Sequence, residues 1–287
     1  MNCLVTGGAG FIGSNLVDSL IENGNKVIVI DDESASENEH FYWNDKAQNY
    51  KYDICDYNLI KPLFNNIDVV FHLAAESRIQ VAIKNPDRTI NVNCLGTSNV
   101  MLASKVSNVK KVIYSSTSAY YGIKNNVPNK EDMPRDCLNP YAISKVGTDL
   151  IGRYHAEAYG QKVMTTRMFT HTGPRRGDVF AESTFAKQIA MIEHDMIPPV
   201  IKVGNLESMR TWSDVRDAVR AYYMLVTVNP IAGEYYNIGG SYHCTIREML
   251  DHLISLSTKK RDIKIEVDPE RLRPIDADLQ IPDTTKF

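Results

Sequence analysis

The sequence predicts an α/β fold, in which a doubly wound parallel β-sheet is followed by a smaller mixed α/β domain. Three observations lead to this prediction: β-branched runs alternate with amphipathic segments through the first half, a glycine-rich turn follows the first run, and the alternation breaks down near residue 170. The 287 residues, 43% hydrophobic and 23% charged, suffice for a sizeable core. We expect a first domain over residues 1–169, to which some later elements return, and a second over 170–287.

The expected elements follow one another in a regular order. The predicted strands of the first half are NCLVT, KVIVID, YKYDI, DVVFHLAA, KKVIYSS and KVMTTRMF. Amphipathic segments between them indicate βαβ units, whose helices cover both faces of a parallel sheet. The second half is predicted to contain the loop TGPRRGDVFAES, a helix near 184–194, the strand PVIKVG, a helix near 214–228, the strand EYYNIG and a helix near 245–258.

Composition and charge exclude several classes of function. The net charge is −3 and the chain has no basic block. It therefore lacks the positively charged segment by which a protein binds nucleic acid or an anionic membrane surface. The chain has no run of about 18 apolar residues, so we expect no membrane span. Its five cysteines form no CxxC pair, which favours reduced thiols in the cytoplasm over disulfides or zinc. The histidines show no ligand spacing, and we predict no metal.

The turn TGGAGFIGS places Gly7, Gly10 and Gly13 in a GxxGxxG spacing directly after the first strand. Glycines at such a turn let backbone N–H groups approach a pyrophosphate, and the helix that follows directs its positive end at the anion. This arrangement is typical of a Rossmann-type dinucleotide site, although a simple tight turn is the alternative. Phe11 and Ile12, within the turn, are counted among the expected cofactor contacts.

Acidic residues at the ends of the next strands indicate which dinucleotide binds. Asp31 ends the second strand, where a carboxylate accepts hydrogen bonds from a ribose and repels a 2′-phosphate; this favours NAD over NADP. Asp53 and Ile54 follow the third strand and are predicted to lie on either side of the adenine. For Asp53 an equal alternative is a purely structural role, in which its side chain caps the end of the strand.

Tyr141 and Lys145 stand four residues apart on a predicted helix, so their side chains share one face. A tyrosine acts as a general base at neutral pH only if its pKa falls from about 10 to about 7, which takes roughly 4 kcal/mol. A nearby ammonium stabilises the phenolate, and the sequence therefore predicts a Tyr141 base; an ordinary surface pair is the alternative.

The fifth strand ends in YSSTSAYYG, at the edge of the sheet where parallel strands line a ligand crevice. Thr117 is placed there to share a substrate oxygen with Tyr141. Ser115 is expected at the cofactor. Ser116 and Ser118 are candidates for substrate contact, or for hydrogen bonds to the backbone.

Taken together, the glycine turn, Asp31, HLAAES, NVNCLGT, SSTSAYYG and PYAISK resemble the extended short-chain dehydrogenase/reductases, and among them the nucleotide-sugar epimerase/dehydratase group. The resemblance implies that Tyr141 is the catalytic base, that Lys145 is its partner and a ribose ligand, and that Thr117 is the second hydroxyl. It also implies a homodimer that pairs through residues 87–106 and 140–160. Further implied contacts are those of Leu73, Ala74 and Ala75 along the cofactor, and of Asn93 supporting the active site.

The second half resembles GDP-mannose 4,6-dehydratases and GDP-4-keto-6-deoxymannose reductases in HTGPRRGDVF, KVGNLESMRTWSDVRDAVRAY, YNIGG and DPERLRPIDADLQIPD. The resemblance implies that Arg210 and Arg273 hold the diphosphate of a GDP- or UDP-hexose and that Asp276 contacts its ribose. Arg176 is expected to contact the phosphates or the base of the sugar nucleotide. The alternative is that it lies in a solvated loop. Thr170 stands where an asparagine is usual and is expected to weaken one substrate contact.

Ala119 is the most informative departure from the dehydratases. The resemblance implies that those enzymes carry a glutamate at this place, where it acts as acid and base. A methyl group transfers no proton. We therefore expect a nucleotide-sugar 4-epimerase or 4-ketoreductase that works through a 4-keto intermediate, with a 4,6-dehydratase as the alternative. A non-catalytic NAD-binding regulator is a further alternative of another class, which the presence of Thr117, Tyr141 and Lys145 together disfavours.

Overall fold

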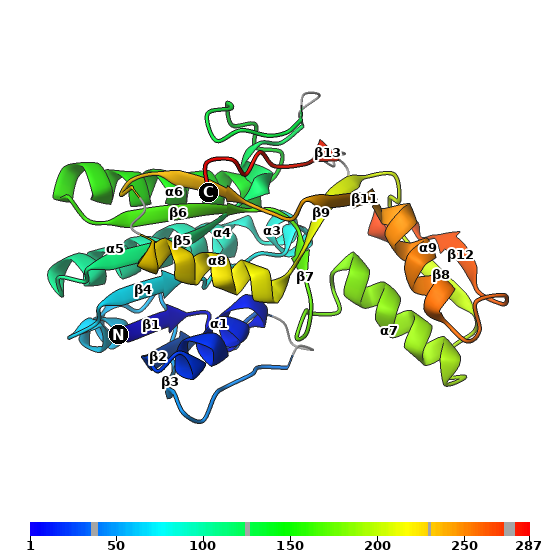
Figure 1. Ribbon diagram of the computed structural model, residues 1–287, viewed down its shortest axis with the longest axis horizontal. Coiled ribbons are helices and arrows are strands. Elements are labelled where there is room, and N and C mark those ends of the chain that lie inside the picture. Colours follow the sequence, from blue (N-terminus) through cyan, green and yellow to red (C-terminus); the bar gives the residue numbers. More distant parts are fainter. Residues whose placement is uncertain (36–39, 124–126, 229–230, 273–278) are drawn as a thin grey trace.

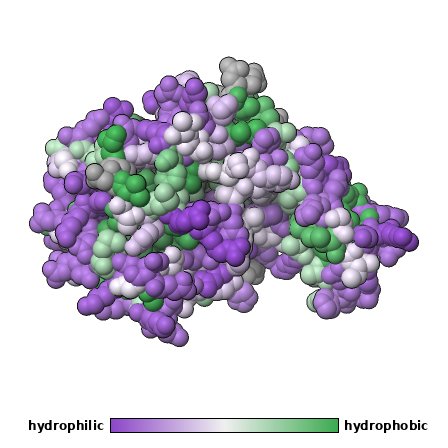
Figure 2. All heavy atoms as spheres, viewed as in Figure 1, coloured by the Kyte–Doolittle hydropathy of each residue, from purple (hydrophilic) through white to green (hydrophobic). Residues whose placement is uncertain are grey.

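The computed structural model describes residues 1–35, 40–123, 127–228, 231–272 and 279–287. Within these ranges the chain forms a larger lobe around one parallel sheet and a smaller lobe beyond the C-terminal ends of its strands, at the right of Figure 1. Figure 2 shows that the face in this view is covered mainly by hydrophilic residues, with small hydrophobic patches between them.

The sheet of the larger lobe has seven strands in the order β10-β6-β5-β4-β1-β2-β3, and every neighbouring pair is parallel. This arrangement confirms the predicted doubly wound α/β fold. The chain winds outward in both directions from β1, and a crevice forms where the order reverses. The strands are β1 (Asn2–Thr6), β2 (Lys26–Asp31), β3 (Gln48–Lys51), β4 (Val69–His72), β5 (Lys111–Thr117), β6 (Val163–Met168) and β10 (Tyr235–Ile238).

Helices cover both faces of this sheet. Because side chains alternate along a strand, Cys3 and Val5 pack into the core under α1 and α8, whereas Leu4 packs into the core under α5. Figure 1 shows α1 and α8 side by side, and these two helices are in contact. The helical segments of this lobe are α1 (Phe11–Glu22), α2 (Tyr57–Ile60), η1 (Lys61–Phe64), α3 (Ile79–Lys84), α4 (Pro86–Ile90), the π-helix η2 (Asn91–Leu95), α5 (Gly96–Val106), η3 (Ser118–Tyr120), α6 (Pro140–Tyr159) and α8 (Val215–Thr227).

The smaller lobe has its own hydrophobic core, which α7, α9 and the parallel pair β8 and β12 share. Short strands connect it to the larger lobe: β9 pairs with β7, β11 and β13. Since β10 and α8 belong to the larger lobe, residues after 170 contribute to both; the boundary at 169 stays a prediction. The elements are β7 (His171–Thr172), α7 (Ala181–Glu193), β8 (Val200–Val203), β9 (Met209–Asp214), β11 (Tyr242–Thr245), α9 (Ile246–Leu256), β12 (Lys264–Val267), η4 (Pro269–Arg271) and β13 (Leu279–Gln280).

The described part of the chain has neither a membrane-spanning helix nor a cluster of metal-binding side chains. Of the helices that the structure describes, none combines the length and hydrophobicity needed to cross a bilayer. In the same part of the chain, no group of three or more His, Cys, Asp or Glu side chains is arranged to hold a metal ion.

Candidate active site

A cavity of about 330 Å³ opens at the C-terminal ends of β1, β2, β4, β5 and β6. This is the edge at which ligands bind in open parallel sheets. The cavity brings together most of the predicted site residues, which come from distant parts of the sequence. Those lining it are Gly7, Gly10, Phe11, Ile12, Gly13, Asp31, Asp53, Ile54, Leu73, Ala74, Ala75, Ser115, Ser116, Thr117, Ser118, Tyr141, Lys145, Thr170 and Arg176.

The glycine turn lines the middle of this cavity, between the ends of β2 and β4, and two of its glycines, Gly7 and Gly13, leave no room for a side chain. Gly7 has a φ of +70°, and a Cβ there would lie 2.7 Å from the backbone nitrogen of Ala74. A Cβ on Gly13 would lie 2.0 Å from the Gly7 carbonyl oxygen. No side chain caps the start of α1 at Gly10, so the first backbone N–H groups of the helix remain available to an anion.

Asp31 connects the glycine turn to the end of β2. Its carboxylate accepts hydrogen bonds from the backbone N–H groups of Ala9, at 3.0 Å, and Glu33, at 2.9 Å. Burial raises the pKa of Asp31, and these two hydrogen bonds oppose the rise. Asp53 accepts from the backbone N–H of Cys55 at 2.8 Å, which is the capping role left open above, while it also lines the cavity.

Tyr141 occupies the first turn of α6, which packs on β5, and lines the cavity from there. Asn139 caps this helix by accepting a hydrogen bond from the backbone N–H of Ala142 at 2.9 Å, and Pro140 suits its first position. Thr117 and Tyr141 line the same cavity, and Thr117 Oγ1 accepts a hydrogen bond from the backbone N–H of Ala119 at 3.2 Å. Burial raises the pKa of Tyr141, whereas Thr117 and the positive charge of Arg176 lower it, because both stabilise the phenolate.

Lys145 lies one helical turn further on and is 4% exposed. Its Nζ donates to the Ser115 carbonyl at 2.8 Å and lies 5.0 Å from the centroid of the Tyr114 ring. Burial lowers the pKa of Lys145 to about 8, and the charge of Asp149 opposes this shift. The amine is therefore still mostly protonated at neutral pH. The predicted approach of this ammonium to the Tyr141 hydroxyl stays a prediction.

The other serines at the end of β5 have protein partners or are buried. Ser115 Oγ accepts a hydrogen bond from the Tyr222 hydroxyl at 2.7 Å, and Ser118 Oγ donates to Gln280 Oε1 at 3.4 Å. Ser116 is 4% exposed. Substrate contact by Ser116 and Ser118 remains a prediction.

The predicted arginines lie in different surroundings. Arg176 pairs with Glu182 at 3.1 Å, and its guanidinium stacks between the rings of Phe11 and Phe180. Arg210 lies in β9 and donates to the Met209 carbonyl; it is not among the residues that line the cavity. Arg273 and Asp276 lie outside the described residues.

Asn93 supports the cavity from the π-helix η2 without lining it. Its Oδ1 accepts from the backbone N–H of Glu76 at 2.8 Å, and its Nδ2 donates to Ser144 Oγ, also at 2.8 Å. Ser144 in turn donates to the Tyr141 carbonyl at 2.7 Å. Asn93 therefore joins the loop after β4 to the helix that carries Tyr141.

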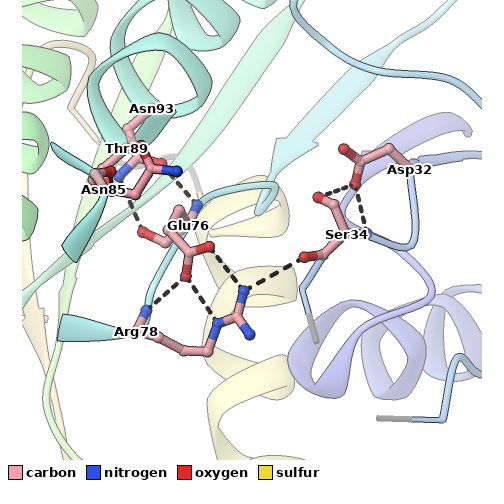
Figure 3. A network of polar contacts seen from close by, with 7 residues as sticks. All are labelled: Asp32, Ser34, Glu76, Arg78, Asn85, Thr89 and Asn93. Carbon is pink, nitrogen blue, oxygen red and sulfur yellow. Dashed lines mark hydrogen bonds and ion pairs between the residues drawn. The ribbon is translucent and has the colours of Figure 1, made fainter. Parts of the chain in front are cut away.

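Sequence reasoning missed four charged residues that line the same cavity, Asp32, Glu76, Arg78 and Arg88. Glu76 and Arg78 form an ion pair of 2.8 Å, and Figure 3 shows them facing the segment after β2. The available signal was their position, because Glu76 follows directly on Leu73–Ala75, which were predicted to lie along the cofactor.

Comparison with known proteins agrees with this geometry. The sequence profile of the family described as GDP-mannose 4,6 dehydratase matches residues 4–287. The chain belongs to this family. It is an enzyme family of nucleotide-sugar epimerases, dehydratases and reductases, and the resemblance to the extended short-chain dehydrogenase/reductases is confirmed.

Three similar proteins illustrate the range of activities in this family. The GDP-6-deoxy-D-mannose reductase of Pseudomonas aeruginosa is 28% identical, over 94% of this chain and 84% of that protein. The UDP-glucose 4-epimerase of Thermotoga maritima, solved with UDP-glucose, has a TM-score of 0.88 and 31% identity, over 100% of this chain and 91% of that one. DesIV of Streptomyces venezuelae, a dTDP-glucose 4,6-dehydratase solved with NAD bound, has a TM-score of 0.87 and 26% identity, over 100% and 89%. Membership of this family is therefore compatible with three reactions: epimerisation, reduction and dehydration.

Proposed function

We propose that this enzyme binds NAD and modifies a nucleotide sugar at C4 through a 4-keto intermediate, as a 4-epimerase or a 4-ketoreductase. The observation that carries the proposal is that Tyr141 and Thr117 line the same cavity as the glycine turn, where Thr117 lowers the pKa of Tyr141. A dinucleotide on that turn would direct its reactive end toward these two hydroxyls.

NAD supports the chemistry by accepting a hydride from the sugar C4 when it is bound. Tyr141 takes the proton from the sugar O4, and Thr117 holds the same oxygen by a hydrogen bond. Burial works against the base because it raises the pKa of Tyr141, whereas the positive charge of Arg176 lowers it. The proposed approach of the Lys145 ammonium would favour the phenolate further. Lys145, held on the Ser115 carbonyl, is also the proposed ligand of the cofactor ribose.

The acidic residues of the cavity support NAD over NADP. Asp31 and Asp32 both line the ribose end, where they would repel a 2′-phosphate. The similar dehydratase DesIV was solved with NAD. The roles proposed for Arg210, Arg273 and Asp276 at the diphosphate and ribose of a GDP- or UDP-hexose rest on resemblance, and the division at residue 169 into NAD-binding and sugar-nucleotide-binding domains is proposed on the same ground.

The distribution of acids favours epimerisation or ketoreduction over 4,6-dehydration. Among the described residues that line the cavity, the acids are Asp31, Asp32, Asp53 and Glu76. The first three lie at the ribose and adenine end. Glu76 already accepts three hydrogen bonds from Arg78, so its carboxylate oxygens are engaged with that partner and are not directed at a sugar. Dehydration remains the second candidate because the family profile carries that description.

The test is to incubate the pure protein with UDP-glucose, UDP-N-acetylglucosamine and GDP-mannose and to analyse the products by mass spectrometry and NMR. We expect a product of unchanged mass with inverted configuration at C4, or, for a ketoreductase, reduction of an added 4-keto sugar nucleotide with consumption of NADH. A product lighter by one water would identify a dehydratase and contradict the proposal. Tight NAD binding without turnover of any of these substrates would favour the regulator.

We infer that the protein forms a homodimer through α5 and α6, as the resemblance implies. These helices are in contact and expose several large apolar side chains: Leu102, Val106, Ile143, Leu150 and Tyr154. A cluster of this kind is typical of an interface. We expect a dimeric mass in sedimentation analysis and a shift toward monomer for Leu150→Glu. The matched control is Leu256→Glu, a similarly exposed leucine at the end of α9, which should leave the mass unchanged; a monomeric wild type would contradict the inference.

A further inference from the structure

We propose that Arg78, anchored on Glu76, forms a strap across the dinucleotide end of the cavity and retains NAD between turnovers. The strap consists of Glu76 and Arg78 on the loop after β4 and of Ser34 on the segment after β2. The inference rests on the proposed binding of NAD, and it assigns to Glu76 and Arg78 a part in holding that cofactor.

The ion pair at one end of the strap is firmly built. Arg78 Nε donates to Glu76 Oε1 at 3.0 Å and Arg78 Nη2 donates to Glu76 Oε2 at 2.8 Å. The backbone N–H of Arg78 donates to the same carboxylate at 3.0 Å. The Glu76 side chain is only 3% exposed, and a bidentate pair of this kind holds the planar guanidinium in one orientation.

Glu76 is in turn fixed by its own backbone. Asn93 Oδ1 accepts from the Glu76 N–H, and Asn93 Nδ2 donates to the Glu76 carbonyl at 3.1 Å. Figure 3 shows this connection on one side of Glu76 and Arg78 on the other. Because Asn93 also reaches Ser144 of α6, the anchored end of the strap is continuous with the helix that carries Tyr141.

The other end of the strap reaches the opposite side of the crevice. Arg78 Nη2 donates to the Ser34 carbonyl at 3.4 Å, and Figure 3 shows the guanidinium between Glu76 and Ser34. Ser34 is held by Asp32, whose carboxylate accepts from both its N–H, at 3.0 Å, and its hydroxyl, at 2.6 Å. Asp32 and Ser34 line the cavity together with Glu76 and Arg78.

The position of the two ends in the sheet gives the strap its function. β1 lies between β2 and β4, and the glycine turn extends from the end of β1. The strap therefore joins the segments on the two sides of the turn where the pyrophosphate is proposed to bind. A dinucleotide lying on the turn passes between these segments, and the strap must open before it can leave.

The Glu76 end of the strap is the fixed end. It has three charge-assisted hydrogen bonds, all of them within one loop. We expect Arg78 to remain on Glu76 when the strap opens. Slow release of the cofactor suits a reaction in which the hydride returns to the sugar, because net reduction requires a fresh reduced cofactor in every turnover. The strap therefore favours the epimerase over the ketoreductase.

The experiment measures the release of NAD from the full-length protein without any sugar nucleotide. Protein loaded with radiolabelled NAD is mixed with excess unlabelled NAD, and the retained label is followed over time. We expect Arg78→Ala to accelerate release about 10- to 100-fold, as for the loss of a hydrogen bond to a charged group. Arg78→Lys, which keeps the charge without the planar fork, should fall between Arg78→Ala and wild type.

Arg220→Ala is the matched control, because Arg220 is an exposed arginine of α8 that pairs with Asp217 at 3.1 Å. It should release NAD at the wild-type rate. Arg78→Ala leaves the buried Glu76 carboxylate without its ion pair and should lower the apo melting temperature, so release is measured well below that temperature and compared with Arg78→Lys, which keeps a cation beside Glu76. NAD bound by every protein with equal release rates would overturn the strap and leave the proposed function standing. A wild type that binds no NAD would overturn the proposed cofactor and the strap with it.

Discussion

Tyr141→Phe is expected to lower kcat by about 10³-fold, within the range that a positioned acid/base supplies, while NAD binding is retained. The substitution removes the oxygen that takes the O4 proton and leaves the ring, so the packing of the first turn of α6 should persist. The Thr117 hydroxyl keeps its hydrogen bond from the Ala119 N–H and still lines the cavity, where it can bind water or substrate. The loss should therefore appear in kcat more than in KM, which steady-state kinetics on the substrate identified by the product analysis will measure.

Tyr154→Phe is the matched control for this prediction. Tyr154 belongs to the same helix, is 57% exposed and shares its hydrogen bond with Tyr159 at the surface. Its variant should retain wild-type kinetics. Activity of Tyr141→Phe within a few-fold of wild type would show that another group takes the proton and would remove the basis of the proposed mechanism.

Gly7→Ala is expected to destabilise the fold by about 2–5 kcal/mol and to abolish measurable NAD binding. Two costs combine at this position. The φ of +70° is unfavourable for a residue with a Cβ, which costs about 1–2 kcal/mol. The added Cβ would also meet the backbone of Ala74 at 2.7 Å, and relieving such overpacking costs about 1–3 kcal/mol. Chemical denaturation and calorimetric titration with NAD measure the two effects.

Gly24→Ala separates these two costs. Gly24 has nearly the same φ, +74°, but a Cβ there would meet nothing within 4 Å. Its variant should lose only the backbone part, about 1–2 kcal/mol, and bind NAD normally. Equal destabilisation in the two variants would show that the turn and the loop after β4 move apart freely, which would contradict a rigid pyrophosphate site.

Much of the fold could be predicted because the signal is local. Each predicted strand of the first half corresponds to an observed strand, and the helices expected near 184–194, 214–228 and 245–258 correspond to α7, α8 and α9. Strands that are buried on both faces read as continuous apolar runs, and amphipathic helices repeat with their own period. Both patterns can be read within the segment itself, without knowing which other elements it packs against.

The short strands of the smaller lobe were missed for the opposite reason. β7 and β13 contain two residues each, and β9 follows the predicted strand PVIKVG without an apolar run of its own. Such segments become strands because a partner from a distant part of the chain supplies the hydrogen bonds, as β9 does for β7 and β13. The sequence around them carries no comparable signal.

The sequence by itself determined the parallel sheet, the glycine turn and the identity of the residues available for chemistry, because these depend on local backbone preferences and on side-chain type. Only the tertiary structure decided which of them meet. It placed Thr117 against Tyr141, directed Lys145 to the Ser115 carbonyl and connected Glu76 and Arg78 to Ser34 across the crevice. Contacts between residues tens of positions apart depend on the order of the strands and on the path of the loops between them, and no local pattern encodes either.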